Sequence, residues 1–494
     1  MDGALPDGVT AIVAAVAAGR RTVAEIVDEH VDRCRALHER VNGLVQPRYD
    51  EARREAALAL PGGPLAGVPT SVKECFPVRG LETTLGIRSR RGCRDEADAA
   101  IVTRLRAAGA IVLGKGNVPQ AMYLHETDNP VWGRTVHPHA PDRGPGGSSG
   151  GDAALVASGC VALAIGNDLA GSIRQPAHAC GVAALLPRAA TLGRGGAFET
   201  MPGLVGQRSR AGLLGRTVAD VALGWRAIAD GGRSLGAPSG PLRVAWWDDA
   251  GPLEPSPAVR RGVRMAVECL RSTGARIERL DAATATEAAW IHLALLSADG
   301  GNDIRRLFGA ERPIPQVARL LALAGFSPAA RRIIAGACVW TGRGIEGLAL
   351  RRTGPRRGRR LARALVERAG IEAVVEAWRD RHDVIVCPVS ALPALRHGSA
   401  ASLVVAAAPC LLANLVDLAA GSVPVTSVEP GEERGRPWSP DPVRRLARRT
   451  DEGSAGLPIG VQVVALDRRP GIGELLVLET MRAIAAGLTP AVSR

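Results

Sequence analysis

The spacing of apolar residues changes along the chain and predicts its main regions. Between residues 10 and 60 apolar residues recur at intervals of three and four, as at Val23, Ile26 and Val27, with charged residues on the opposite side. This spacing predicts two packed helices, which the PGGP stretch at 61–64 brings to an end. Residues 1–64 are therefore expected to form a helical layer.

After this layer, short apolar runs separated by glycine and proline replace the helical spacing. Residues 67–73 predict a strand that ends at Lys73, residues 98–108 predict a helix, and residues 110–114 predict another strand. Alternation of strand and helix is typical of an α/β sheet domain. We expect this core to occupy residues 65–235.

The second half of the chain is expected to extend the same domain. It begins with a predicted strand at 242–246, and its residues 283–382 are rich in Ala, Leu and Arg and mostly helical in spacing. Polar residues at 429–456 predict a loop. A single domain is therefore predicted, with a variable helical region at 236–382 and a C-terminal region at 383–494 that completes the sheet. Further strands are predicted at 274–277, 383–388, 422–426 and 457–464, and a last helix at 473–486.

The longest apolar stretch, residues 403–421, is interrupted by Pro409, Asn414 and Asp417. We expect it to form core or the wall of a cleft, with no membrane span. The first residues carry acidic groups and no basic segment, so no secretory signal is expected. Nine cysteines are scattered singly without a CxxC pair, which is typical of reduced thiols. These features predict a cytoplasmic protein.

The positive charge of the chain points to a candidate binding site at only one place, the run at 351–360. The chain has 494 residues, an apolar fraction of 46% and a net charge of +13, and the positive charge is dispersed apart from the run RRTGPRRGRR at 351–360. Two interpretations of the run stay open: a solvated loop or helix start, and a site for an anionic partner. Because aromatic residues make up only 3% of the chain, few rings can stack on bases, and we expect no nucleic-acid partner.

Lysine is almost absent from this basic chain. It occurs only at Lys73 and Lys115, so that 60 of the 62 basic residues are arginine. Arginine stays charged in proteins, whereas a buried lysine can lose its proton and act as a base. A retained lysine is therefore a candidate for a role that arginine cannot fill, in shape or in chemistry.

Two glycine-rich motifs, GGSSGG at 146–151 and GNDLAGSIRQPA at 166–177, contain the candidate nucleophiles. The first motif alone is also typical of a flexible loop. In the second, Gly171 allows the backbone to approach a substrate closely, and such a turn can aim consecutive N–H groups at one oxygen, as an oxyanion hole requires. Asp168 and Arg174 flank this turn, and we expect them to form an ion pair that supports it.

Taken in order, five motifs resemble the amidase signature family, whose members cleave carboxamides with a Ser–cis-Ser–Lys triad. The resemblance extends more weakly over nearly the whole chain. It implies a large mixed β-sheet covered by helices on both faces, a small-molecule amide substrate, and no cofactor or metal. The motifs are GVPTSVK at 67–73, GKGNVPQ at 114–120, NPVWGRT at 129–135, GGSSGG and GSIRQPA.

The resemblance also implies a role for each matching residue. Ser172 matches the nucleophile, Ser148 the bridging serine and Lys73 the general base, with the cis peptide at Gly147–Ser148. Neutral Lys73 would take a proton from Ser172 through Ser148, and the reverse transfer would protonate the leaving amine. Contacts to the oxyanion or the substrate are implied for Gly147, Ser149, Leu169, Ala170 and Gly171.

Asn167 departs from the family pattern, because serine or threonine usually stands there and supports the triad. Asparagine can donate and accept hydrogen bonds, so we expect activity to survive. Lys115 matches a motif outside the triad, and we expect it to pack and form hydrogen bonds. No zinc or Ser–His site is expected from His137, His139 or His178.

The leading hypothesis is a hydrolase of linear, non-peptide amides that forms an acyl-enzyme on Ser172. One alternative is a glutamine-hydrolysing component of a tRNA-dependent amidotransferase, because GSIRQPA resembles those proteins as well. Another is a binding protein without activity, which the retained triad disfavours. Specificity is expected to arise from residues 283–380 and from the loops near Met122 and Met201, and a homodimer is expected at the family level.

Overall fold

A mixed β-sheet of 11 strands runs through the described chain, which comprises residues 7–59, 62–229 and 240–488 of a computed structural model. The predicted boundary at 235–236 lies outside the described residues. In spatial order the strands are β1 (Leu44–Pro47), β3 (Ile111–Gly116), β2 (Pro69–Lys73), β6 (Leu163–Asp168), β8 (Arg210–Gly215), β7 (Ala183–Leu186), β12 (Ala420–Ser427), β13 (Pro458–Ala465), β11 (Val384–Pro388), β9 (Arg243–Trp246) and β10 (Arg276–Arg279).

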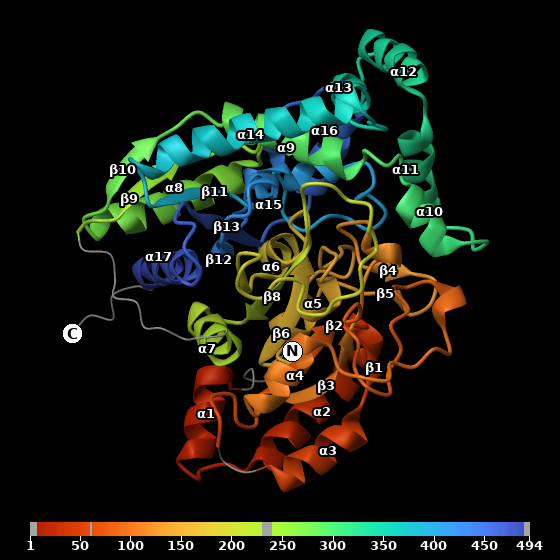
Figure 1. The fold of residues 1–494 in the computed structure, drawn as a ribbon. Coiled ribbons are helices and arrows are strands. Elements are labelled where there is room, and N and C mark those ends of the chain that lie inside the picture. The colour runs from red at the N-terminus through yellow and green to blue at the C-terminus, as the bar shows by residue number, and fades with distance from the viewer. Residues whose placement is uncertain (1–6, 60–61, 230–239, 489–494) are drawn as a thin grey trace.

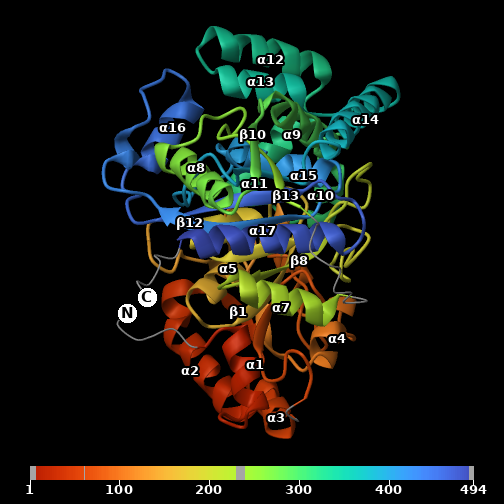
Figure 2. The same cartoon turned by 90° about the vertical axis from the view of Figure 1, so that its left-hand side faces the viewer.

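The sheet is covered on both faces, and residue alternation along β13 shows how. Ile459 and Val461 approach the helix α8 (Pro257–Ser272), whereas the next residue, Gly460, contacts His178 of α6 (Arg174–Cys180) on the opposite face. Figures 1 and 2 show α8 on one side together with α17 (Ile472–Leu488) and α7 (Val218–Ile228), and α6 on the other side beside α5 (Gly150–Ala157). The predicted α/β fold with a large mixed sheet and helices on both faces is confirmed.

The N-terminal layer differs from the prediction of two helices. It contains three helices and an edge strand, because α2 ends where Asn42 adopts a left-handed conformation (φ 48°) and the chain then extends as β1 along β3. A four-residue strand at a sheet edge carries too little alternation to be recognised by spacing. The helices are α1 (Val9–Ala17), α2 (Val23–Val41) and α3 (Tyr49–Leu58).

The predicted helical region forms the upper part of the molecule in Figure 1. Among the described helices, none is by itself both long and apolar enough to cross a membrane, and α11 and α12 pass that test only as a pair bent by 114°. The helices of this region are α9 (Ala283–Leu296), α10 (Asn302–Phe308), α11 (Pro315–Gly325), α12 (Pro328–Trp340), α13 (Gly344–Arg352) and α14 (Arg359–Arg379).

The C-terminal region contains one confirmed prediction and one that is wrong. Residues 403–421 form η3 (Val404–Cys410) and α15 (Leu411–Leu415), and side chains of both line a cavity, as expected of a cleft wall. The predicted loop at 429–456 instead contains α16 (Pro442–Asp451), whose N-cap Asp441 accepts from the Val443 backbone N–H at 2.8 Å. The remaining elements are η1 (Arg88–Arg90), α4 (Ala100–Ala107), η2 (Gln120–Met122), β4 (Asp128–Asn129), β5 (Gly133–Arg134) and η4 (Glu432–Arg434).

Candidate active site

Strand β2 ends at Lys73, whose side chain is fully buried. Its Nζ lies 2.6 Å from Ser148 Oγ, 2.5 Å from Asn167 Oδ1 and 3.3 Å from the Asn167 carbonyl oxygen. Asn167 comes from β6, which runs parallel to β2, and Ser148 comes from the turn that leads into α5. Parallel pairing of β2 with β6 thus brings the buried lysine to Asn167, and the turn before α5 adds Ser148.

Two buried groups near this contact have pKa values shifted from their ordinary values. Burial lowers the pKa of Lys73 to about 8, an effect that the nearby carboxylates of Asp152 and Asp168 partly oppose. Burial raises the pKa of Asp152 to about 7, while the hydrogen bond from Ser71 Oγ at 2.7 Å favours its ionised form. Neutral Lys73 is therefore accessible near neutral pH.

The two serine motifs are joined directly through their backbones. The Gly147–Ser148 peptide is cis, at the position implied by the family resemblance. The Ser149 N–H donates to the Ser172 carbonyl oxygen at 3.0 Å, and the Gly147 N–H donates to Gln175 Oε1 at 3.1 Å. Because these donors are occupied and Ser149 is fully buried, Gly147 and Ser149 position the serine turn, and their N–H groups are not free to bind a substrate.

A buried ion pair holds the second motif, as expected. Asp168 Oδ2 accepts from Arg174 Nε at 3.0 Å, and both side chains are fully buried. Arg174 also donates to Gln462 Oε1 at 2.6 Å, and Asn414 Nδ2 donates to Asp168 Oδ1 at 2.9 Å. Although burial alone would raise it, the Arg174 guanidinium keeps the pKa of Asp168 well below its usual value. The ion pair therefore stays charged and fixes the turn.

This arrangement corrects the predicted set of oxyanion donors. The Gly171 N–H donates to Asp168 Oδ1 at 2.7 Å, so it is directed into the turn and away from a substrate. Within the described chain no acceptor is recorded for the N–H groups of Leu169, Ala170 and Ser172. These three remain as candidate oxyanion donors.

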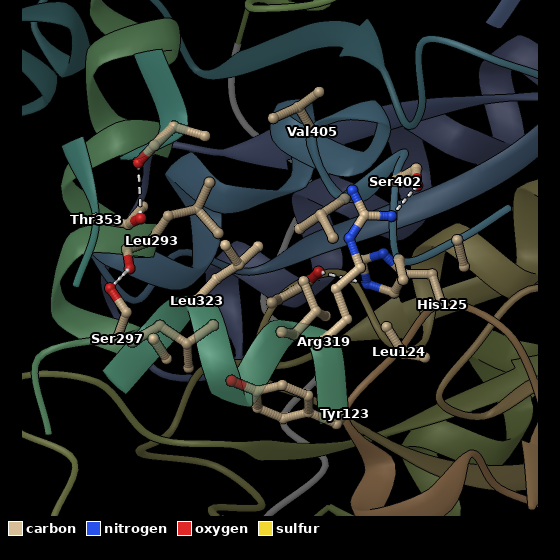
Figure 3. Close-up of a pocket in the computed structure, with 18 of the residues that line it drawn as sticks. Tyr123, Leu124, His125, Leu293, Ser297, Arg319, Leu323, Thr353, Ser402 and Val405 are labelled. Carbon is tan, nitrogen blue, oxygen red and sulfur yellow. Dashed lines mark hydrogen bonds between the residues drawn. The ribbon is translucent and has the colours of Figure 1, made fainter. Parts of the chain in front are cut away.

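Two cavities meet at Ser172. The larger, of about 540 Å³, extends from Ser172 to the helices above the sheet, and the smaller, of about 50 Å³, is lined by both Ser148 and Ser172. Figure 3 shows Leu293, Leu323 and Val405 around the larger cavity. Those three side chains come from α9, α11 and η3, and the predicted specificity residues Met122 and Met201 line both cavities.

Sequence reasoning missed three residues of the site. His125 lines the larger cavity, and its Nε2 lies 3.0 Å from the Ala170 carbonyl oxygen. Asn414 and Gln462 contact the ion pair from the C-terminal region. Asn414 interrupts an apolar run in the sequence. A polar residue in such a run needs a buried hydrogen-bond partner, and this was the one available signal of its role.

The other singled-out residues have structural partners. Lys115 Nζ donates to Thr83 Oγ1 at 2.8 Å and to Asp95 Oδ2 at 2.9 Å, which confirms its packing role. His178 lies between the Leu392 and Gly460 backbones, and His137 Nε2 contacts the Ala179 carbonyl oxygen. Among the described residues, no group of His, Cys, Asp or Glu side chains is arranged to hold a metal ion.

The family model named Amidase matches residues 25–469 of the chain. The chain belongs to the amidase signature family. This amidase is 29% identical to fatty-acid amide hydrolase 1 of Sus scrofa, an alignment that covers 87% of this chain and 77% of that one. It is 35% identical to indoleacetamide hydrolase of Bradyrhizobium diazoefficiens over 54% of this chain and 55% of that one.

Solved structures show the same fold for this amidase. A fatty acid amide hydrolase matches with a TM-score of 0.82 and 21% identity, over 98% of this chain and 85% of that one. A 6-aminohexanoate cyclic dimer hydrolase matches with a TM-score of 0.74 and 24% identity, over 99% and 98% of the two chains. The protein is thus an amidase-family hydrolase that acts on C–N bonds.

Proposed function

We propose that this amidase hydrolyses linear amides through an acyl-enzyme on Ser172, with Lys73 as general base and Ser148 as proton relay. The contacts of Lys73 Nζ carry this proposal. Both Asn167 oxygens can only accept hydrogen bonds, so they take two N–H groups of the amine. A neutral lysine has only two, and its lone pair is then directed at the remaining partner, the Ser148 hydroxyl.

The proton movements follow from this orientation. Lys73 accepts the Ser148 hydroxyl proton while Ser148 Oγ takes the proton of Ser172, whose oxygen attacks the carbonyl carbon. The N–H groups of Leu169, Ala170 and Ser172 stabilise the resulting oxyanion. The proton returns from Lys73 through Ser148 to the leaving nitrogen, and the C–N bond breaks. Water, activated by the same relay, then releases the acid from Ser172.

The two cavities support an assignment of the two halves of the substrate. Ser148 must protonate the leaving amine, and Ser148 lines only the small cavity. The amine half therefore occupies about 50 Å³, and the acyl half occupies the larger cavity. Apolar side chains, mainly leucine and alanine, form most of the wall of that cavity, so we infer an apolar acyl chain and a small amine.

The relatives agree with this inference in part. Two of them are named fatty acid amide hydrolase 1, from Sus scrofa and Caenorhabditis elegans. A component of the glutamyl-tRNA(Gln) amidotransferase of Thermus thermophilus is 33% identical, over 60% of this chain and 65% of that one. Glutamine is zwitterionic, whereas the apolar residues Met122, Leu169 and Met201 line both cavities beside Ser172.

The catalytic assignment is tested by active-site labelling. A fluorophosphonate should label the wild-type enzyme, and Ser172→Ala should abolish the labelling. Ser402→Ala is the matched control, because this serine also lines the larger cavity and should leave labelling intact. Lys73→Arg keeps the charge but cannot act as a base, so kcat should fall by ~10³-fold. Near-normal turnover of Lys73→Arg would contradict the mechanism.

The substrate assignment is tested with a series of primary amides of increasing acyl length. Each buried methylene is worth about 0.8 kcal/mol, so kcat/KM should rise about fourfold per added carbon until the cavity is full. A series with bulky N-substituents should show the opposite trend, because the small cavity limits the amine. Equal rates for acetamide and decanamide would contradict an apolar acyl site without affecting the triad.

A further inference from the structure

A second pocket, of about 270 Å³, lies beside the acyl cavity and contains most of the basic run at 351–360. Its walls come from α9, from the start of α12, and from the end of α13, the start of α14 and the connection between them, at the top of Figure 1. It shares Trp290, Arg331, Leu350 and Thr353 with the acyl cavity. Seven arginines and a single glutamate line it: Arg331, Arg332, Arg351, Arg352, Arg356, Arg360, Arg363 and Glu367.

Carboxylates neutralise only two of these arginines. Arg363 Nε lies 3.0 Å from Glu367 Oε1, and Arg352 pairs with Glu287. For the other five, the described part of the chain provides no carboxylate within ion-pair distance. The pocket therefore concentrates positive charge that the protein itself leaves unbalanced.

The most buried of the five is Arg331, which is 5% exposed. Its guanidinium donates to the Leu350 carbonyl oxygen at 3.1 Å, to Thr353 Oγ1 at 2.6 Å and to the Leu323 carbonyl oxygen. Arg356, which is half-buried, donates to the Gly354 carbonyl oxygen at 3.0 Å. Neutral oxygens thus hold both guanidiniums in place without cancelling their charge.

The charges in the pocket repel one another. Burial lowers the pKa of Arg331, and the neighbouring Arg356 lowers it further. Burial also lowers the pKa of Arg356, with Arg352 and Arg360 adding to the decrease against the attraction of Glu367. An anion in the pocket would relieve this repulsion, since partly buried cations are costly without a partner.

We propose that this arginine pocket binds a phosphate-bearing anion. Guanidinium groups match phosphate oxygens with two parallel hydrogen bonds, and several of them around one pocket favour a group with multiple charges. The volume of about 270 Å³ suits a diphosphate or a lipid phosphate headgroup. In the same run, Arg357 and Arg359 are exposed and do not line the pocket, so the sequence separates into site residues and solvated residues.

The test is calorimetric titration of the whole protein with sodium diphosphate. One equivalent should bind the wild-type protein. Arg351→Gln combined with Arg360→Gln removes two unpaired, exposed guanidiniums from the pocket, so the affinity should fall at least about tenfold while the fold is kept. Arg357→Gln combined with Arg359→Gln removes the same charge outside the pocket and should change the affinity less than about twofold.

Either of two results would overturn the proposal: no binding by the wild-type protein, or equal losses in the pocket and control variants. A second titration uses a soluble short-chain phosphatidic acid with the same variants. Stronger, pocket-dependent binding of this lipid identifies a lipid headgroup as the ligand, and equal binding identifies the phosphate group alone. The readout needs no turnover, so it does not depend on the proposed hydrolysis.

Discussion

Asn167 holds Lys73, the proposed general base, with two oxygens of a single residue. The departure from serine or threonine at this position was the main question left by the sequence. The side-chain and backbone oxygens of Asn167 both accept from Lys73 Nζ, so the asparagine replaces a hydroxyl with a second fixed acceptor. The substitution therefore preserves the support of the triad in a different form.

Asp152 opposes part of the effect that burial has on the pKa of Lys73. Its ionised carboxylate stabilises the protonated form of Lys73, whose pKa is about 8. In wild-type enzyme, kcat/KM should fall up to about tenfold per pH unit below this value, because only neutral Lys73 accepts a proton. Asp152→Asn removes the charge but retains an acceptor for Ser71, so the acidic limb of the profile should move to lower pH.

The measurement is a pH profile of kcat/KM with one apolar amide. Asp142→Asn is the control, since this aspartate is largely exposed and should leave the profile unchanged. A shift of the acidic limb to higher pH in Asp152→Asn would show that the carboxylate does not act on Lys73 in this way.

Among the elements, the nucleophile turn, which we define as residues 168–174 with the proposed nucleophile Ser172, depends on partners far away in the sequence. The Asp168–Arg174 pair joins β6 to α6, and it is completed by Asn414 of α15 and Gln462 of β13. A charged pair without access to water needs such neutral partners, because every unsatisfied donor or acceptor costs free energy. The position of the turn therefore depends on how α15 and β13 pack against it.

Asn414→Ala should show this dependence. The change removes a donor to Asp168 Oδ1 and an acceptor from Arg174, so the free energy of unfolding should fall by about 1–3 kcal/mol. The kcat should fall as well, because Gly171 and Ser172 lose part of their support. Denaturant unfolding and steady-state kinetics measure the two effects, with the half-buried Asn302→Ala as a control away from the turn. Unchanged kcat would contradict a positioning role for α15.

The spacing of apolar residues and the motifs predicted those elements whose own sequence is long and regular enough to be recognised. Strand β13 and helix α17 were recognisable because each has a long apolar run with the spacing of its element. Strand β1 escaped recognition because it has only four residues, and α16 because arginines dominate it. In α16 the N-cap Asp441 followed by Pro442 was a readable start signal.

In the candidate site, too, the features within contiguous motifs could be predicted and those that depend on the folded structure could not. Lys73, Ser148 and Ser172 lie in contiguous motifs, so their proximity could be expected from the family resemblance. The use of the Gly171 N–H by Asp168 depends on side-chain rotation within the turn, and the contact between His125 and the Ala170 carbonyl depends on how two distant loops meet. Neither hydrogen bond produces a pattern that can be recognised in the sequence.

At the scale of the whole molecule, the larger cavity, to which the proposal assigns the acyl chain, lies between Ser172 and the helices α9, α11, α12 and α13. Cys338 of α12 lines this cavity and is half-buried, whereas Cys93 is exposed and the other seven cysteines are buried. An apolar maleimide should therefore react rapidly at two thiols. An acyl-chain ligand should protect Cys338 and leave Cys93 reactive, which makes Cys93 an internal control.

Mass spectrometry of the labelled protein distinguishes the two sites. Modification of Cys338 should raise the KM for long-chain amides, because the label occupies the acyl cavity, and Cys338→Ser should be insensitive. Equal protection of both thiols, or protection of neither, would contradict the assignment of this cavity to the acyl chain.

The position of β13 has a consequence for how the enzyme is made. This strand lies between β12 and β11 within the sheet, and its Gln462 follows Arg174 by 288 residues. During synthesis the turn that carries Ser172 leaves the ribosome long before Gln462, which contacts its Arg174, has been made. A nascent chain that already contains Lys73, Ser148 and Ser172 should thus remain inert, and hydrolytic activity should begin only when nearly all of the polypeptide has been released.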